Sequence, residues 1–200
     1  MNATVFIVDD NTVMLAATAQ YLESNDLRTR CYPSGRAFLT EHDPCIPGCV
    51  LLDVVMPEMS GLAVQRELIR RDPNRPIVFL SGRAEIWESV AAMKAGAVDF
   101  LTKPADEETL LGAVRLAIER DARWRVTEVR KQETQERFAH LTPRERSVLH
   151  LVVTGMLNKQ IAHQLGIGEK TVKVYRGRIV EKLGVRTVPD LVRFVQRLSA

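Results

Sequence analysis

The stretch VLLDVVMPEMSG, residues 50–61, places the carboxylate of Asp53 directly after three apolar residues and before a Val-Val-Met-Pro segment. Burying a charge among apolar residues is costly unless the charge has a partner or a task. Short apolar runs without clean alternation are typical of strands buried on both faces of a parallel sheet. The stretch therefore indicates a buried strand that ends at a functional carboxylate.

Four further segments are predicted strands: TVFIV (4–8), LRTRCY (27–32, the weakest), PIVFL (76–80) and VDFL (98–101). Helical patterns lie between them. Leu15, Ala19 and Leu22 share one helical stripe, and Ser34 is suited to cap another helix. A strand-helix alternation repeated five times predicts an α/β fold, a doubly wound five-stranded parallel sheet.

Charge divides the chain into an acidic and a basic half. Residues 1–120 hold 12 Lys and Arg against 17 Asp and Glu, whereas residues 141–200 hold 11 against 4. The basic excess favours a polyanion partner over a merely solvated surface. We therefore expect an α/β domain at 1–120, a helical linker at 121–140, and a nucleic-acid-binding domain at 141–200.

Apolar runs are too short for a membrane protein. None approaches the roughly 20 residues of a membrane span, and the start MNATVFIVDD lacks the basic segment and long apolar run of a signal peptide. We expect a soluble, cytoplasmic protein without a membrane partner.

Polar residues follow the predicted strands at their carboxyl ends, where ligands bind in a doubly wound sheet. These residues are Asp9, Asp10, Asp53, Ser81 and Lys103. Three neighbouring carboxylates repel one another unless a cation lies among them, and oxygen ligands suit Mg²⁺. A carboxylate can accept a phosphoryl group, whose oxygens an ammonium and a hydroxyl stabilise. The set predicts a phosphoryl acceptor site centred on Asp53.

Three cysteines suggest a competing metal site. Cys31, Cys45 and Cys49 lie in the first half with His42. Their spacing lacks the paired C-x2-C units of structural zinc. Buried or incidental thiols are the favoured interpretation.

The basic half contains a helix-turn-helix pattern. Thr142-Pro143-Arg144-Glu145 is a capping box with proline at the first helical position. A second helix is expected from a cap at Asn158 through Leu165, and residues 166–168 form a short turn into a third helix beginning near Glu169. Two short helices joined by a tight turn are typical of this motif.

The third helix has two unlike faces at about 100° per residue. Its inward residues are predicted to be Val172, Ile179 and Leu183. Its outward residues are predicted to be Lys170, Lys173, Val174 and Gly177, with Arg178 and Lys182 on a flank. Such a face suits the major groove of double-stranded DNA. Angle alone leaves open a solvated basic face.

The motifs VDD, LLDVVMPEMSG, FLSG and AGAVDFLTKP resemble the receiver domain of two-component response regulators, across residues 1 to about 120. The resemblance implies a flavodoxin-like sheet in which a sensor histidine kinase phosphorylates Asp53. It further implies that Asp10, Asp53 and the Val55 carbonyl ligate Mg²⁺, with Asp9 assisting through water.

The same resemblance implies that Ser81 and Lys103 contact the phosphoryl group and that Phe100 is a switch aromatic. A plain half-buried strand residue is the alternative for Phe100. The bond between Lys103 and Pro104 is expected to be cis. Arg83 and Val55 occupy positions that in the family tune hydrolysis of the phosphorylated residue.

Residues 141–198 resemble the LuxR-type helix-turn-helix, joined to a receiver as in the NarL/FixJ family; LTPRE, NKQIA, TVKVY and KLGV carry the similarity. The resemblance implies base contacts from Lys173, Val174 and Gly177 and phosphate contacts from Lys159, Thr171 and Arg178. The last helix, residues 188–198, offers an apolar face that either dimerises or closes the core: Leu191, Phe194, Val195 and Leu198.

These inferences combine into one mechanism. Phosphorylation of Asp53 is expected to reshape the face of the fourth helix and fifth strand, represented by Val90, Met93, Lys94 and Leu101. A homodimer then forms, binds promoter DNA and acts with RNA polymerase. Two rivals are a phosphatase, which would want a second acid where Val55 stands, and a regulator that ignores phosphorylation. The chain is not expected to be an enzyme.

Overall fold

The computed structural model describes residues 3–82 and 85–198. The chain forms two compact units, Met1–Arg125 and Val126–Ala200. Helix α5 (Glu107–Ala139) contributes residues to both. As its charged, Gly- and Pro-poor sequence predicts, this helix continues from the α/β unit through the segment expected to be a linker. No helix in the described part of the chain has the length and apolar character that crossing a membrane requires.

The first unit contains the predicted five-stranded sheet. Its strands are β1 (Thr4–Val8), β2 (Arg28–Tyr32), β3 (Gly48–Leu52), β4 (Ile77–Ser81) and β5 (Asp99–Thr102). All neighbours are parallel, in the order β2-β1-β3-β4-β5. Because β2 lies on one side of β1 and β3 on the other, the strand order reverses between β1 and β3.

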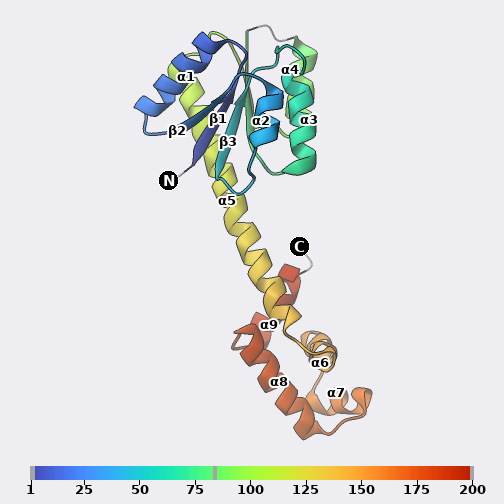
Figure 1. Ribbon diagram of the computed structural model, residues 1–200. Coiled ribbons are helices and arrows are strands. Elements are labelled where there is room, and N and C mark those ends of the chain that lie inside the picture. Colours follow the sequence, from blue (N-terminus) through green and yellow to red (C-terminus); the bar gives the residue numbers. More distant parts are fainter. Residues whose placement is uncertain (1–2, 83–84, 199–200) are drawn as a thin grey trace. The chain divides into compact units, whose positions relative to one another are not determined.

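Helices cover both faces of this sheet (Figure 1). Helix α1 (Thr12–Ser24) and α5 cover one face, while α2 (Gly35–Glu41), α3 (Gly61–Arg71) and α4 (Ile86–Lys94) cover the other. Successive strand side chains point to opposite faces. In β1, Val5 and Ile7 enter the core beneath α1 and α5, whereas Phe6 and Val8 enter the other core. Both faces are therefore buried.

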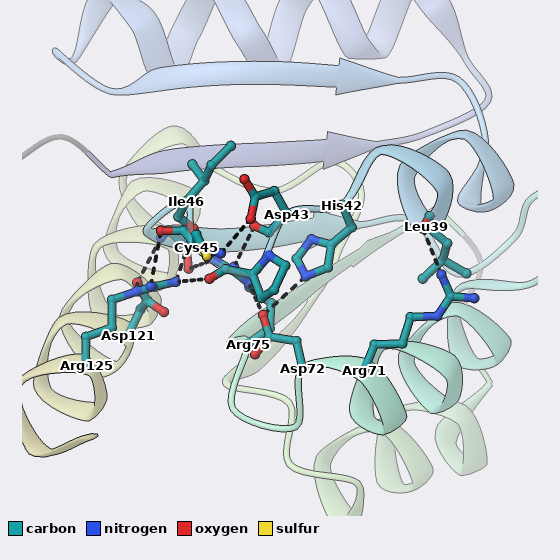
Figure 2. Close-up of polar contacts among 12 residues, drawn as sticks. Leu39, His42, Asp43, Cys45, Ile46, Arg71, Asp72, Arg75, Asp121 and Arg125 are labelled. Carbon is teal, nitrogen blue, oxygen red and sulfur yellow. Dashed lines mark hydrogen bonds and ion pairs between the residues drawn. The ribbon is translucent and has the colours of Figure 1, made fainter. Parts of the chain in front are cut away.

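A buried arginine organises the end of the unit opposite the carboxyl ends of the strands (Figure 2). The Arg75 side chain is fully buried and donates to the Asp72 carboxylate at 2.9 Å. The same guanidinium donates to the backbone carbonyls of Asp43, Pro44, Ile46 and Gly48. Arg75 thereby fixes the loop that leads into β3.

Helix α5 holds the same loop from its other side (Figure 2). Asp121 accepts from the Gly48 N–H at 2.9 Å and from Arg125 Nε at 2.7 Å. Arg125 also donates to the carbonyls of Pro44, Cys45 and Ile46. These contacts tie the last turn of α5 in this unit to the sheet.

The competing metal site is absent from the described residues. His42 Nε2 instead lies 3.2 Å from an Asp72 carboxylate oxygen. Cys31 and Cys45 are exposed, and burial raises the pKa of the Cys49 thiol to about 12. Among the residues that the structure describes, Asp9, Asp10 and Asp53 form the only group of three or more His, Cys, Asp or Glu side chains close enough to share an ion.

The second unit is helical. Beyond the end of α5 it contains α6 (Pro143–Val153), α7 (Asn158–Leu165), α8 (Glu169–Leu183) and α9 (Val188–Leu198). The predicted capping box is present, since the Thr142 and Glu145 side chains each accept from the other residue's backbone N–H. Val172, Ile179 and Leu183 are buried, as expected.

One expectation for this unit is wrong. Asn158 is the first residue of α7 and does not cap it, because its side chain accepts from Arg176 on α8 at 2.8 Å. Lys182, placed on a flank of the predicted DNA face, donates from its ammonium to Glu145 at 2.7 Å. Both side chains fasten helices together.

Candidate functional site

The two central carboxylates are brought together by the register of β1 and β3. Val8 and Leu52 are paired across the two strands, so Asp9 and Asp53 follow at neighbouring strand ends. The Asp53 N–H donates to the Val8 carbonyl at 2.9 Å, which continues the pairing by one residue. Both residues therefore stand at the point where the strand order reverses.

The loop after β3 closes tightly over Asp53. The Gly61 N–H donates to the Val54 carbonyl at 2.8 Å, which brings the start of α3 against the strand end. A Cβ at Gly61 would lie 2.1 Å from the Asp53 carbonyl oxygen. Only glycine fits there without moving the backbone, which explains the end of the VLLDVVMPEMSG stretch.

Lys103 bridges the carboxylates from the end of β5. Its ammonium lies 2.5 Å from an Asp9 oxygen and 3.3 Å from Asp53 Oδ1. The peptide bond between Lys103 and Pro104 is cis, as expected. Ser81, fully buried, is the last residue of β4, not the first residue after it; its carbonyl accepts from the Lys103 N–H.

The acidic cluster of three carboxylates carries more negative charge than the Lys103 ammonium neutralises. Oxygens of Asp9, Asp10 and Asp53 lie within 4.8 Å of one another. Burial raises the pKa of the Asp53 carboxyl; the Lys103 charge opposes this effect, and the Asp9 charge adds to it. Asp53 Oδ1 is buried, and its partner among the described residues is the Lys103 ammonium 3.3 Å away, an ion pair without full hydrogen-bond geometry. Three clustered carboxylates that share a single ammonium offer hard oxygen ligands that fit Mg²⁺.

Other residues predicted for this site lie around it. Val55, two residues after Asp53, has a side chain 58% exposed. Phe100 is partly buried and stacks on Phe79, with ring centroids 5.6 Å apart. Arg83 lies outside the described residues.

The predicted DNA-binding residues share exposure to solvent. They are Lys159, Lys170, Thr171, Lys173, Val174, Gly177 and Arg178. A Cβ at Gly177 would meet no atom within 4 Å, so this part of α8 leaves open space beside its backbone. Val174 is 51% exposed beside the lysines. The arrangement offers ammonium groups and an apolar contact to a groove.

Helix α9 resolves an alternative that the sequence left open. Leu191 and Phe194 are buried, and Val195 and Leu198 pack against the same core. These four residues close the core of the second unit in this structure. Val195 and Leu198 remain partly exposed.

An exposed apolar surface occurs instead on α4, and sequence reasoning found only part of it. Ile86 is 85% exposed, Trp87 59%, and Val90 and Met93 44% each. We call these four residues the α4 face. Leu101, which was expected to join it, is buried beneath α1 and α5 because alternate residues of β5 point to opposite sides of the sheet. The missed signal was the pair of apolar residues at the start of α4, Ile86 and Trp87, which extend the exposed apolar surface.

Comparisons with known proteins match both units. Residues 5–115 match the response regulator receiver domain, and residues 139–195 match the luxR family of bacterial regulatory proteins. The chain therefore belongs to the two-component response regulators that join a receiver domain to a LuxR-type DNA-binding domain. These families are regulators of transcription, not enzymes.

Particular relatives agree with the predicted NarL/FixJ membership. The chain is 44% identical over 197 residues to the response regulator protein TmoT of Ectopseudomonas mendocina, covering 98% of this chain and 90% of TmoT. It is 38% identical to the transcriptional regulatory protein FixJ of Azorhizobium caulinodans, covering 94% and 90%. The solved structure of the response regulator StyR matches with a TM-score of 0.92 at 38% identity, covering 98% of this chain and 100% of that one.

Proposed function

We propose that the chain is a phosphorylation-controlled regulator that acts in the cytoplasm. A sensor histidine kinase phosphorylates Asp53, the phosphorylated protein forms a homodimer, and the dimer binds promoter DNA and acts with RNA polymerase. One observation carries this proposal: Asp9, Asp10 and Lys103 surround Asp53 where the strand order reverses. Family membership supports it.

The phosphoryl step uses the carboxylate of Asp53 as nucleophile. One of its oxygens forms a bond to phosphorus while the phosphorus–nitrogen bond of the kinase's phosphohistidine breaks, and the imidazole leaves. Asp9, Asp10, Asp53 and the Val55 carbonyl would hold Mg²⁺, which neutralises charge on the phosphoryl oxygens. Lys103, now bound to Asp9, lies close enough to contact a phosphoryl group on Asp53.

Transmission begins at Ser81 and Phe100. Ser81 is buried at the end of β4, and Phe100 stacks on Phe79 of the same strand. A hydroxyl that moves to the phosphoryl group changes the space beside Phe100, and an inward movement of its ring alters the surface between β5 and α4. The partly buried position of Phe100 supports this role.

The dimer is proposed to form through the α4 face. Four apolar side chains exposed together on one short helix are suited to a second copy of the chain, because a twofold interface is self-complementary. DNA is then bound through α8, where Lys173, Val174 and Gly177 contact bases. Lys159, Thr171 and Arg178 contact phosphates, and Lys170 lies on the same outward face.

Beryllofluoride with Mg²⁺ tests the coupling, since it mimics a phosphoryl group on a carboxylate. Added to the wild type, it is expected to convert monomer to dimer and to strengthen promoter DNA binding by about tenfold or more, because two linked half-sites bind together. Light scattering and fluorescence anisotropy measure the two effects. No change in either would refute the proposal.

A Lys173→Ala variant serves as the control that separates the two steps. It should dimerise normally with beryllofluoride, because residue 173 lies in the other unit. Its affinity for DNA should fall roughly tenfold through loss of one groove contact.

Replacing Trp87 with alanine is expected to weaken the activated dimer about 30-fold, since a large exposed aromatic at the centre of an interface carries a disproportionate share of its binding energy. Beryllofluoride binding itself should persist. Sedimentation over a concentration series measures the change. Val13→Ala, which truncates an apolar side chain 74% exposed on α1, is the matched control and should dimerise like the wild type. Equal behaviour of the two variants would exclude the α4 face.

A further inference from the structure

An open groove of about 470 Å³ lies within the second unit, between the end of α5 and α9. We call it the α5–α9 groove. Arg130, Thr134 and Arg137 line it from α5, where a spacing of three to seven residues places them on one helical face. Arg193, Phe194 and Arg197 line it from α9, where Arg193 and Arg197 are four residues apart and lie on one helical face. The turn after α8 closes one end.

Arginines dominate the walls of the groove. Five line it: Arg130, Arg137, Arg186, Arg193 and Arg197. Two carboxylates accompany them, those of Glu133 and Asp190. Asp190 accepts from the Thr187 hydroxyl at 2.6 Å and lies 3.7 Å from Arg193. Positive charge therefore exceeds negative charge by three around one concave surface.

Four of these guanidinium groups lack a partner in the part of the chain that the structure describes. The side chains of Arg130, Arg137, Arg186 and Arg197 form no hydrogen bond or ion pair with the described residues. Arg75 and Arg125, by contrast, each bind a carboxylate. Unpaired like charges gathered in a groove repel one another, and an anion among them relieves that repulsion.

The chemistry of the groove selects the class of anion. A guanidinium presents a planar fork of N–H donors that matches phosphate oxygens in pairs. Because the arginines stand on both walls and in the closing turn, a ligand with more than one phosphoryl group is suited to contact several of them. Thr134 and Phe194 also line the groove, but the Thr134 hydroxyl donates to the Arg130 carbonyl at 2.7 Å and Phe194 belongs to the core of the unit, so the arginines supply the donors.

We propose that the α5–α9 groove binds a small anion with two or more phosphoryl groups, of the class of pyrophosphate or a nucleoside diphosphate. The groove is separate from the proposed DNA-binding face. It adjoins Gly184 after the C-terminal end of α8, whereas the proposed DNA contacts of this helix run from Lys170 to Arg178, about 21 Å to about 9 Å away along the helix axis. Occupation would fasten the end of α5 to α9.

Calorimetric titration with inorganic pyrophosphate tests the proposal on the full chain. EDTA is present, so that no Mg²⁺ can recruit phosphate to the acidic cluster, and ionic strength is low and fixed. Saturable binding with one pyrophosphate per chain is expected. An Arg137→Gln, Arg197→Gln variant should bind it roughly tenfold more weakly or worse, because two charge-assisted contacts are lost.

Two matched variants make the result specific. Lys170→Gln, Lys173→Gln removes equal charge from the other end of α8 and should leave pyrophosphate affinity unchanged within about twofold. Arg137→Lys, Arg197→Lys keeps the charge but loses the planar fork, so its affinity should fall between those of the wild type and the glutamine variant. Thermal unfolding of each variant verifies the fold.

Three results would overturn the proposal. The first is the absence of saturable pyrophosphate binding. The second is an equal loss of pyrophosphate affinity in the Arg137→Gln, Arg197→Gln variant and in the Lys170→Gln, Lys173→Gln variant. The third is a loss of DNA affinity that is as large in the arginine variant as in the lysine variant. The second would indicate general attraction of anions to the basic unit, and the third would assign the groove to the DNA interface. None of these results bears on phosphorylation of Asp53.

Discussion

Replacing Asp53 with asparagine is expected to abolish phosphorylation of the protein by acetyl phosphate or by a histidine kinase. An amide nitrogen replaces the nucleophilic oxygen, and the cluster with Asp9 and Asp10 loses one of its three charges. Phosphate incorporation, measured by intact-protein mass spectrometry, should fall from a substantial fraction to none. Beryllofluoride should then no longer change oligomeric state or DNA affinity.

Loss of function should occur without loss of folding. Burial raises the pKa of the Asp53 carboxyl above its value in the unfolded chain, so the charged form is disfavoured by the fold at neutral pH. The neutral amide removes that cost, and the variant should unfold at the same temperature as the wild type or a higher one. A lower unfolding temperature would show that Asp53 has a structural task.

Asp26→Asn is the matched control for this experiment. Asp26 is exposed in the turn after α1 and has a positive φ of 62°, a conformation that asparagine also adopts readily. The control should incorporate phosphate like the wild type. Continued phosphorylation of the Asp53→Asn variant, at any residue and with unchanged DNA binding, would transfer the acceptor role elsewhere.

Replacing Arg75 with alanine is expected to destabilise the receiver unit by about 3–5 kcal/mol, the cost of leaving a buried charge without its partner. The substitution removes five hydrogen bonds of one guanidinium and leaves the buried Asp72 carboxylate with His42 alone (Figure 2). The unfolding temperature of this unit should fall by roughly 10 °C or more. Calorimetry resolves the two units of the chain.

Arg70→Ala supplies the comparison for Arg75. Its side chain is 78% exposed and forms an ion pair of 3.3 Å with Glu67, so its loss should cost at most about 0.5 kcal/mol. Phosphate incorporation should persist in the folded fraction of both variants, because the network lies at the opposite end of the sheet from Asp53. Equal unfolding temperatures for the two variants would contradict a structural role of the Arg75 network.

Acid should weaken the same network. Burial opposes ionisation of Asp72, but the hydrogen bond from His42 and the Arg75 charge outweigh burial and hold its pKa below the usual value. A carboxyl whose pKa is lower in the folded than in the unfolded state stabilises the fold above the unfolded pKa. That contribution is lost as pH falls through the lowered pKa. In Arg75→Ala, the loss should begin at a higher pH.

The candidate phosphoryl site was largely predictable from the sequence because its parts obey local rules. Asp9, Asp53 and Lys103 each follow a short apolar run, and the carboxyl ends of parallel strands meet at one edge of a sheet. The position of the Lys103 ammonium was not predictable, because its closer approach to Asp9 than to Asp53 depends on how distant strands pack.

Dimer surfaces were less predictable. Leu101 and Val90 are both apolar residues of the expected face, yet β5 turns Leu101 into the core while α4 leaves Val90 exposed. Leu191 and Phe194 form an apolar stripe on α9, and this stripe packs into the core of the second unit. An apolar residue is consistent with a core or with an interface, and only its packing distinguishes the two.

The sequence by itself determined the strand-helix alternation, the helix-turn-helix and the chemistry expected at the strand ends. Those features depend on periodicity, caps and residue types within short segments. Tertiary structure alone decided the buried role of Arg75, the anchoring of α5 by Asp121 and the α5–α9 groove. Each joins residues about 30 or more positions apart, as with Arg75 and the carbonyls of the loop at 43–46, and no local pattern records which distant segments pack together.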